Sequence, residues 1–600
     1  RFNWNAAIAQ DPFDNSTVYF GSQFVHKSTD KGNNWTVISP DLTTNDSTKQ
    51  RQDKSGGLTI DATGAENHTT ILVIEPSPRE KGVIWAGTDD GNLQITRDGG
   101  ATWTNVIGNM KGVPAGSWIN QIKASTYNDG EAVAVINNYR RFDFKPYLMR
   151  TKNYGKTWEP LVKDGDVFGY SLSFVQDPVQ PNLMFYGTEH GLYISIDGAK
   201  TWSKFNNGYP NVSTMDLVIQ ERESDLVIGT FGRAIWVLDD INPLRVLATK
   251  GQANVMAAKV TAVPPVTAYE VSTRSANGPA NPGSSTFEGE NRNYGFASIK
   301  FFAKKPAMPE RPNRDAAAQG APAGRGQFPG GQGGAFAGRG GQGGPGGRGA
   351  ARGPQAKVEI FNSAGELIRN FDTPVEDGLN VAQWRFDENP PEGTEEPQGG
   401  GGGFARFFRV GTPALPGKYT VKITVDGATD ETTLEYKMDP REEYDMSALI
   451  ARREVLKDIS VISSQVTTMS GKVSADVESV DKVLAALQGK RGEEYNTLRT
   501  KSNDIKKQLE ELQGLIGRGG RGFFGGGGGD GPTPLQTEVF SVLRTVNGSF
   551  DAPTDAQKTS VERLKDKKAE VQKKMDDWYA ANWDAYVNAV KAVSFSPIGN

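Results

Sequence analysis

A short pattern that returns four times in the first third of the chain limits what this part can fold into. The pattern approximates Ser/Thr-x-Asp-x-Gly-x-Thr-Trp, as in TRDGGATW. Its copies end at Trp35, Trp103, Trp158 and Trp202, which are 68, 55 and 44 residues apart. Recurrence on this scale indicates one structural unit repeated along the chain, rather than four independent functional loops.

The residues around each copy follow one order, which predicts small antiparallel sheets. An apolar run, a Gly-Thr-like turn, a second run and an Asp-Gly turn precede the Trp, as in VIWAGTDDGNLQITRDGGATW. A four-stranded propeller blade takes roughly 40–50 residues, so the longer intervals contain inserted loops. We therefore predict about five blades of a β-propeller in residues 1–245, ending with LVIGTFGRAIWVLDD. Because the chain starts inside a repeat, we expect an incomplete ring, with earlier blades and any export signal preceding Arg1.

The aspartates of the repeated pattern are predicted to hold turns rather than to perform catalysis. Asp30, Asp98 and Asp197 occupy equivalent positions, where a carboxylate accepts hydrogen bonds from amides two and three residues further on. The third copy has Asn153 instead, and a side-chain amide closes such a turn but is a poor general acid. The Trp that ends each copy offers an apolar face to wedge against neighbouring strands.

The remainder of the chain changes character twice. Residues 246–440 contain alternating runs such as KVEIFNS and KYTVKITV, which predict an Ig-like β-sandwich. A Gly-rich tract near 305–356 is predicted to be a disordered loop within it. Residues 441–600 carry apolar residues with helical spacing, which predicts a helical bundle with a Gly-rich loop near 517–532. The predicted fold class is multidomain and mainly β: propeller blades, then a sandwich, then a C-terminal helical bundle.

Composition excludes several classes of function. The chain has no Cys, which excludes disulfides, thiolate metal sites and Cys nucleophiles. Its three His residues are isolated in the sequence, so we predict no metal site and no cofactor. The formal net charge of −4 gives no general attraction to nucleic acid. No apolar run approaches the ~20 residues that a transmembrane helix needs.

The topology of a meander indicates where a ligand site would lie. The Gly-Thr turns and the links between blades emerge at the end opposite the Asp-Gly turns. One of these turns, NNYRRFDFKPY at 137–147, is far longer than its counterparts GTDDGN and GTEHG. Its Arg140, Arg141 and Asp143, together with Tyr139, are predicted to bind a carboxylate or a sugar through paired guanidinium bonds and stacking. The alternative is an Arg–Asp bridge that only fixes the loop.

Two further candidates belong to the same end of the predicted blades. Trp118, in GVPAGSWINQ, precedes the strand that leads into the long turn, and is either a sugar-stacking platform or a core residue. His190 lies beside Glu189 in a short turn of the last blade that carries the repeated pattern. These positions complete the set of candidate ligand-binding residues.

The repeated patterns resemble the Asp-box, or bacterial neuraminidase repeat, of sialidases, xyloglucan-active glycosidases and sortilin-type sorting receptors. Taken with GTFGRAIWVLDD and the regions behind it, the chain resembles the C-terminal part of large bacterial sortilin-like propeller proteins, often labelled glycosyl hydrolases. The resemblance implies a propeller with its boxes at the blade periphery. It does not imply an activity, because function depends on the site and not on the fold.

Three hypotheses of function follow. The first is an exported binding or scaffold protein, extracellular, on the cell surface or in the periplasm, which captures a polypeptide or glycan on one face of the ring. Its sandwich and bundle would brace the ring or dock other envelope or surface proteins. The second is a two-carboxylate glycoside hydrolase acting on a polysaccharide, which needs carboxyl groups ~5–10 Å apart in the ring cleft. The third is a purely structural assembly part. Binding is favoured over catalysis, because a complete sialidase set of arginines, Tyr–Glu pair and Asp is not assignable.

Overall fold

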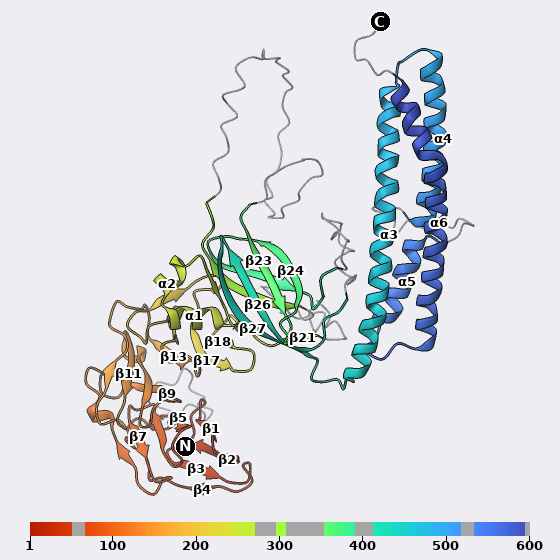
Figure 1. Cartoon of the computed structure of the whole chain (residues 1–600). Helices are drawn as coiled ribbons and strands as arrows, with labels where there is room; N and C mark the ends of the chain where they lie inside the picture. Colours follow the sequence, from red (N-terminus) through yellow and green to blue (C-terminus); the bar gives the residue numbers. More distant parts are fainter. Residues whose placement is uncertain (51–66, 271–295, 308–352, 391–411, 518–532, 594–600) are drawn as a thin grey trace, which may run out of the picture. The chain divides into compact units, whose positions relative to one another are not determined.

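The structure is a computed structural model that describes residues 1–50, 67–270, 296–307, 353–390, 412–517 and 533–593 (Figure 1). The chain divides into two compact units. The first comprises residues 1–266, 300–305 and 376–380, and the second comprises residues 267–299, 306–375 and 381–600. Most of the predicted Gly-rich tract near 305–356, and nearly all of the predicted loop near 517–532, lie outside the described residues.

Within the described part of residues 1–240, the strands form five antiparallel sheets, which we number in chain order. Sheet 1 contains β1 (Ile8–Asp11), β2 (Asp14–Gly21), β3 (Val25–Ser28) and β4 (Thr36–Val37). Sheet 2 contains β5 (Ile71–Pro76), β6 (Ile84–Thr88), β7 (Leu93–Thr96) and β8 (Thr104–Asn105), followed by the 3₁₀ turn η1 (Ile107–Asn109). Sheet 3 contains β9 (Trp118–Ala124), β10 (Ala132–Asn138), β11 (Asp143–Thr151) and β12 (Glu159–Pro160).

The last two sheets complete the series. Sheet 4 contains β13 (Ser171–Gln176), β14 (Met184–Thr188), β15 (Gly191–Ser195) and β16 (Ser203–Phe205). Sheet 5 contains β17 (Thr214–Gln220), β18 (Asp225–Thr230) and β19 (Ile235–Leu238). Consecutive strands are neighbours in every sheet, so each sheet is a meander, the arrangement found in propeller blades. The predicted series of small antiparallel sheets is confirmed.

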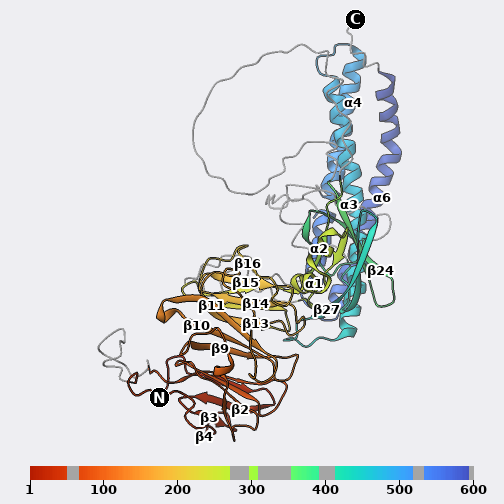
Figure 2. The ribbon, with the colours of Figure 1, turned by 90° about the vertical axis from the view of Figure 1, so that its left-hand side faces the viewer.

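Alternation along the strands gives each inner sheet two apolar faces. In sheet 2, Ile74 and Ala86 are buried against sheet 1, whereas Leu93 and Ile95 are buried against sheet 3. The first strands of successive sheets contact one another, so β1, β5, β9, β13 and β17 form one series. Figure 2 shows the sheets following one another in sequence order, from red to yellow.

The box aspartates lie at tight turns between the third and fourth strands of their sheets. Asp98 accepts hydrogen bonds from the Thr102 amide at 2.9 Å, the Thr102 hydroxyl at 2.6 Å and the Thr96 hydroxyl at 2.8 Å. Asn153 Oδ1 accepts from the Thr157 amide at 2.9 Å, in the same way. The main acceptor contact therefore reaches four residues on, one step further than the sequence predicted, because the turn includes the residue before the Trp.

The turn-holding geometry predicts that Asp98→Ala lowers the melting temperature and that Asp98→Asn lowers it less. The Asn variant keeps one acceptor oxygen, as the third box already does with Asn153. Donors from Thr102 and Thr96 lower the pKa of Asp98 to about 2. The pKa of Asp98 is lower in the folded protein than in the unfolded chain, where it is near 4, so the ionised carboxylate stabilises the folded protein above about pH 4. This stabilisation is lost as the pH falls from about 4 to about 2. Differential scanning calorimetry of both variants at pH 7 and pH 3 checks this prediction. The decrease in melting temperature caused by Asp98→Ala is expected to be larger at pH 7 than at pH 3, and equal decreases at the two pH values would contradict it.

Two helices and two further sheets follow sheet 5. The helices are α1 (Asn242–Lys250) and α2 (Gln252–Ala257). A three-stranded sheet has the order β20 (Val260–Ala262), β22 (Ala297–Ala303) and β25 (Gly378–Trp384). A five-stranded sheet has the order β21 (Ala268–Glu270), β27 (Ala428–Met438), β26 (Gly417–Val425), β23 (Gln355–Phe361) and β24 (Leu367–Pro374). That these strands belong to an Ig-like sandwich stays a prediction.

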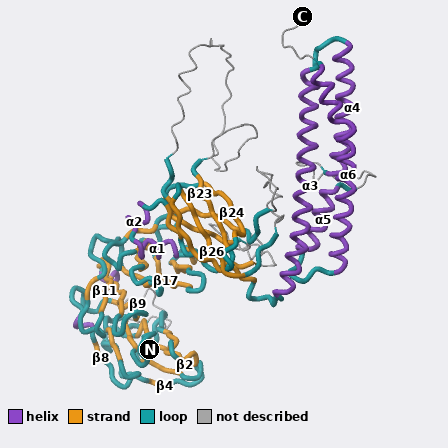
Figure 3. Tube along the Cα trace, viewed as in Figure 1, coloured by secondary structure: helices purple, strands orange, loops and turns teal. Residues whose placement is uncertain are grey.

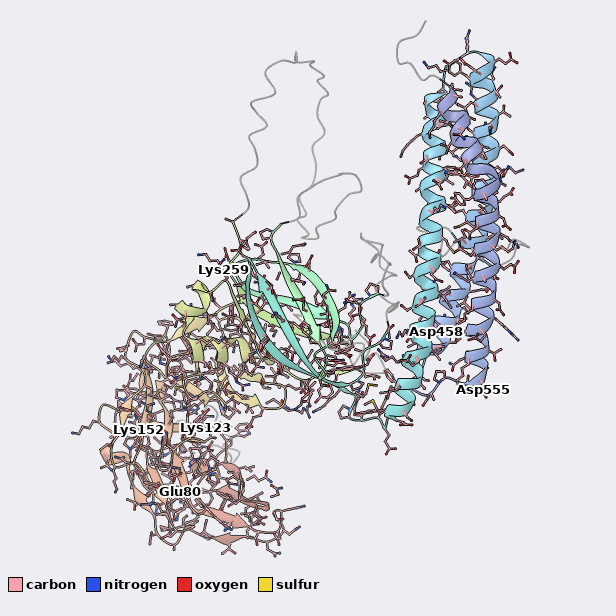
Figure 4. All side chains as sticks on the ribbon, viewed as in Figure 1. Glu80, Lys123, Lys152, Lys259, Asp458 and Asp555 are labelled. Atoms are coloured by element: carbon pink, nitrogen blue, oxygen red, sulfur yellow. The ribbon has the colours of Figure 1, made fainter. Side chains whose placement is uncertain are left out.

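Among the described C-terminal residues, four helices pack around one apolar core (Figure 3). They are α3 (Met446–Ala486), α4 (Glu493–Ile516), α5 (Leu535–Asn547) and α6 (Asp555–Ala592). Asp458, labelled on α3 in Figure 4, accepts from Lys565 of α6 at 2.8 Å. The predicted C-terminal helical region is confirmed. In the part of the chain that the structure describes, none of the helices has the length and apolarity needed to cross a bilayer.

Candidate functional site

The long turn of sheet 3 lies at the end of the sheets opposite the box turns, because successive turns of a meander alternate between its two ends. Trp118 begins β9 and pairs with Asn137 at the end of β10. It therefore lies at the same end as the long turn. Since β9 belongs to the series of first strands, Trp118 lies on the side of sheet 3 where neighbouring sheets meet.

The turn itself contains one 3₁₀ turn, η2 (Tyr139–Arg141), which places Arg140 on an aromatic surface. The guanidinium carbon of Arg140 lies 3.2 Å from the ring centroid of Trp118 and 4.4 Å from that of Tyr139. The Tyr139 ring in turn stacks on Tyr170 with centroids 4.5 Å apart. A cation over an indole face is attracted by the ring quadrupole, so these contacts orient Arg140.

Arg141 takes a different direction from Arg140. Its Nη1 donates to the carbonyl oxygen of Ala115 at 2.5 Å, and its guanidinium lies against Gly116. A Cβ on Gly116 would lie 2.5 Å from Arg141 Nη2, so only glycine leaves room for this contact. The structure thus brings the GVPAGSW segment and the long turn together, with Arg141 as the connection.

Asp143 is engaged within the turn. It accepts from Asn138 Nδ2 at 3.1 Å and from the Tyr147 hydroxyl at 2.8 Å. Partial burial raises the pKa of Asp143, but these hydrogen bonds outweigh it and leave the pKa below its usual value. Asp143 therefore stays ionised and fixes the base of the turn through Asn138 and Tyr147.

A second aromatic pair continues the surface onto sheet 4. His190, in the turn between β14 and β15, stacks on Phe168 with centroids 4.6 Å apart. Its Nε2 lies 3.5 Å from Glu189 Oε2. Phe168 and Tyr170 belong to one link into β13, so this link joins the His190 pair to the Arg140 group. Sequence reasoning missed both rings, although their place just before a first strand at this end was a usable signal.

Asp89 and Asp90 lie in the turn between β6 and β7 of sheet 2, and both carboxylates are hydrogen-bonded within the protein. Asp89 accepts from the Thr70 amide at 2.8 Å and hydroxyl at 3.0 Å. Asp90 accepts from the Thr44 amide at 2.7 Å and hydroxyl at 2.8 Å. Both side chains are buried, and burial raises the pKa of Asp89. These carboxylates hold the link between sheets 1 and 2.

A groove of about 600 Å³ lies at the opposite end, among sheets 3 and 4 and α1. Its lining includes the cationic side chains Arg150, Lys152, Lys200 and Lys250, of which Lys152 is labelled in Figure 4. The box residue Asp197 also lines it, but its carboxylate accepts from Thr201. The candidate residues Trp118, Tyr139 and Arg140 do not belong to this lining. Within the described residues, no group of three or more His, Asp or Glu side chains is placed to hold a metal ion.

Comparison with known families and curated proteins gives no match. No family model matches the chain, and none of the curated proteins matches it.

Solved structures give weak similarities. A GH74 xyloglucanase from Xanthomonas campestris is 16% identical over 39% of this chain and 36% of its own, with a TM-score of 0.29. The GH74 enzyme of Niastella koreensis is 14% identical over 40% of this chain and 47% of its own, with a TM-score of 0.24. YCF48 from Cyanidioschyzon merolae is 14% identical over 39% of this chain and 72% of its own, with a TM-score of 0.25. The chain thus spans less than half the length of either GH74 structure, and the fold description rests on its own sheet topology.

Proposed function

We propose that this chain is an exported, sortilin-like binding or scaffold protein that captures a polypeptide or glycan at the Arg140 end of its sheets. The observation that supports this is the seating of Arg140 on Trp118, with Tyr139 and Tyr170 extending the ring surface. Ring contact covers the face of the guanidinium and leaves its N–H groups directed along its edge. A carboxylate or a sugar hydroxyl accepts from such an edge, while the neighbouring rings stack on apolar parts of the ligand.

Binding is favoured over glycoside hydrolysis by the state of three of the carboxylates at this end of the sheets. Asp89 and Asp90 are buried and hydrogen-bonded to threonines, and Asp143 is held by Asn138 and Tyr147. A two-carboxylate mechanism needs an acid and a base that both face the substrate. The sandwich and helical regions are proposed to dock other envelope or surface proteins.

Loss of Arg140 is expected to weaken capture. A peptide phage library and a glycan array, screened with the wild-type chain, supply the strongest peptide and glycan probes. For these probes, Arg140→Ala is expected to raise Kd about 10- to 100-fold, the effect of losing a charge-assisted hydrogen bond. The matched control is Arg97→Ala, because Arg97 lies 3.8 Å over the Tyr154 ring at the box end. Equal Kd values for wild type and Arg140→Ala would refute the proposed site.

The same preparations distinguish the enzyme alternative. Wild-type protein incubated with a panel of polysaccharides, including xyloglucan, is expected to release no reducing ends. If reducing ends are still released by the purified protein, and this activity is lost when a carboxylate is replaced, the chain is a glycoside hydrolase and the binding proposal is wrong.

A further inference from the structure

The groove at the box end, among sheets 3 and 4 and α1, lies at the position that a tyrosine side chain occupies between sheets 2 and 3. The box turns align residue by residue, so Tyr154 in the sheet 3 box corresponds to Gly198 in the sheet 4 box. Both residues have positive φ, 58° and 75°. The Tyr154 amide donates to Gly130 O at 2.9 Å, and the Gly198 amide donates to Asn182 O at 3.0 Å. Gly198 lines the groove and has no side chain to fill it.

The surroundings of Tyr154 define what this position holds between sheets 2 and 3. The Tyr154 hydroxyl lies 2.8 and 2.7 Å from the two carboxylate oxygens of Glu80, in the turn between β5 and β6, and donates to them. The guanidinium carbon of Arg97 lies 3.8 Å from the ring centroid. An aromatic ring is therefore held between these sheets by a cation over its face and an acceptor at its hydroxyl.

Sheet 3 brings counterparts of both partners to the groove. Asn128 corresponds to Glu80, because the amide of each donates to the Oγ of a serine three residues earlier, at 3.3 and 3.1 Å respectively. Lys152 corresponds to Arg97, because each directly follows the third strand of its sheet and precedes the box Asp or Asn. Asn128 and Lys152 both line the groove. The groove thus has a cation and a polar side chain at the two positions that hold the Tyr154 ring, but no ring of its own.

Positive charge distinguishes the groove from the Tyr154 site. Four cationic side chains, from sheet 3, the sheet 4 box and the end of α1, line it: Arg150, Lys152, Lys200 and Lys250. Arg150 takes the position that Ile95 has in sheet 2, where the side chain is buried in the apolar layer. Glu159 is shared by Arg150 and Lys152, at 2.6 and 3.2 Å. Two cations on one carboxylate leave a positive charge on this wall, and Lys200 adds to it from the sheet 4 box.

The two carboxylates in the lining are engaged within the protein. Glu131 accepts from Asn128 Nδ2 at 2.5 Å, and Asp197 accepts from the amide and the hydroxyl of Thr201 at 3.0 and 2.6 Å. Because Glu131 uses the Asn128 amide nitrogen, the carbonyl oxygen Oδ1 of Asn128 corresponds to the acceptor that Glu80 provides for Tyr154. A neutral carbonyl accepts from a hydroxyl without adding negative charge to the groove.

We propose that this groove is a second binding site, for a small aromatic acid that carries a hydroxyl on its ring. The ring occupies the space over Gly198 and lies against Lys152, and its hydroxyl donates to Asn128 Oδ1. Its carboxylate binds the cations that surround the groove, among them Arg150 and Lys200. The volume of about 600 Å³ is in the range of small-molecule sites. This site lies at the box end and is separate from the Arg140 end.

Isothermal titration calorimetry of the full chain with p-hydroxyphenylpropionate tests the proposal. A ligand of this size is expected to bind with a Kd of about 1 mM or tighter. Phenylpropionate, which lacks the hydroxyl, is expected to bind about 5- to 10-fold more weakly, and p-propylphenol, which lacks the carboxylate, about 10-fold more weakly. Equal affinities for phenylpropionate and cyclohexylpropionate would mean that the groove recognises charge alone. That result, or no binding of p-hydroxyphenylpropionate at about 10 mM, would overturn the proposal.

A double variant tests where the ring binds. Gly198→Tyr combined with Asn182→Gly reproduces the pair of Tyr154 and Gly130, and so fills the groove with a ring of the protein itself. The positive φ is compatible with this change, because Tyr154 already has it. Binding of p-hydroxyphenylpropionate is expected to be lost while circular dichroism melts show a folded protein. Undiminished binding by this folded variant would refute the groove as the site.

A single substitution tests the cation at the ring. Lys152→Met is expected to raise the Kd for p-hydroxyphenylpropionate about 3- to 10-fold. Lys156→Met is the matched control, because Lys156 belongs to the same box but not to the lining of the groove, and it is expected to keep the wild-type Kd. Equal Kd values for Lys152→Met and wild type would contradict the placement of the ring.

The peptide and glycan probes of the Arg140 end separate the two sites. The double variant and Lys152→Met are both expected to bind those probes with the wild-type Kd. A parallel loss of the peptide or glycan probe in the folded variants would mean that the groove is not a separate site. Absence of any peptide or glycan probe, with p-hydroxyphenylpropionate still bound, would refute the proposed function and leave the groove site standing.

Discussion

Replacing Arg245 by Ala is expected to lower the free energy of unfolding of the first unit by about 3–5 kcal/mol, the range measured when one partner of a buried ion pair is removed. Arg245 of α1 donates from Nε to Asp177 Oδ2 at 2.6 Å and from Nη2 to Oδ1 at 3.2 Å. The Asp177 side chain is fully buried and that of Arg245 is 11% exposed. Without the guanidinium, the carboxylate just after β13 stays in a dry position with only backbone donors from Val179 and Gln180.

The chain provides a matched surface pair as the control. Arg79 donates to Asp129 at the same distance, 2.6 Å, but the two side chains are 40% and 54% exposed. Arg79→Ala is therefore expected to cost only about 0–1 kcal/mol. Urea unfolding followed by near-ultraviolet circular dichroism compares the two variants. Similar losses for both would show that α1 is not held to sheet 4 by this ion pair.

The second large effect is expected from Gly187→Ala, which should destabilise the first unit by about 1–3 kcal/mol through overpacking. The new Cβ would lie 2.1 Å from Ser173 Oγ and 2.5 Å from Thr214 O. The serine side chain can rotate away, but the carbonyl belongs to the β17 backbone and moves only with its strand. The sheet 4–sheet 5 layer must then open to admit one methyl group.

Gly229→Ala is the control for this substitution, because the equivalent position in sheet 5 has no strand across it. Its nearest neighbour is 3.6 Å from the new carbon, an ordinary contact, so the change is expected to stay within about 0.5 kcal/mol. Both variants are measured by chemical denaturation. A loss for Gly229→Ala as large as that for Gly187→Ala would mean that strand propensity, not crowding, explains the effect.

The repeated sheets could be predicted from sequence because their signals are local. The box spacing, the Gly-Thr turns and the alternation of apolar residues all lie within about one blade length. A turn closed by the Asp98 carboxylate was predicted from the sequence. The carboxylate accepts from the amide of Thr102, four residues further on, whereas the sequence predicted amides two and three residues further on.

Only part of the candidate site could be predicted, because its contacts join segments that are far apart in the sequence. The length and composition of the turn at 137–147 marked it, but its arginines take separate partners that sequence spacing does not encode. Arg140 lies on Trp118 and Arg141 binds Ala115, because the loop before β9 folds back beside the turn. Phe168 and Tyr170 join the surface through sheet packing alone. Residues 300–305 and 376–380 also group with residues 1–266 in the first unit, across long stretches of sequence.

The meander order of the sheets has a consequence for synthesis. Every strand pair in sheets 1 to 5 joins neighbours in the chain, so each sheet has the low contact order that favours fast folding. Each sheet is able to form as its own segment leaves the ribosome, and its trailing face is sealed when the next segment emerges. β20 pairs with β22 only after residues 297–303 have been made, so this strand pair is completed late. We therefore expect the sheets of the first unit to assemble in chain order, each with an apolar face that stays exposed until the next sheet has formed.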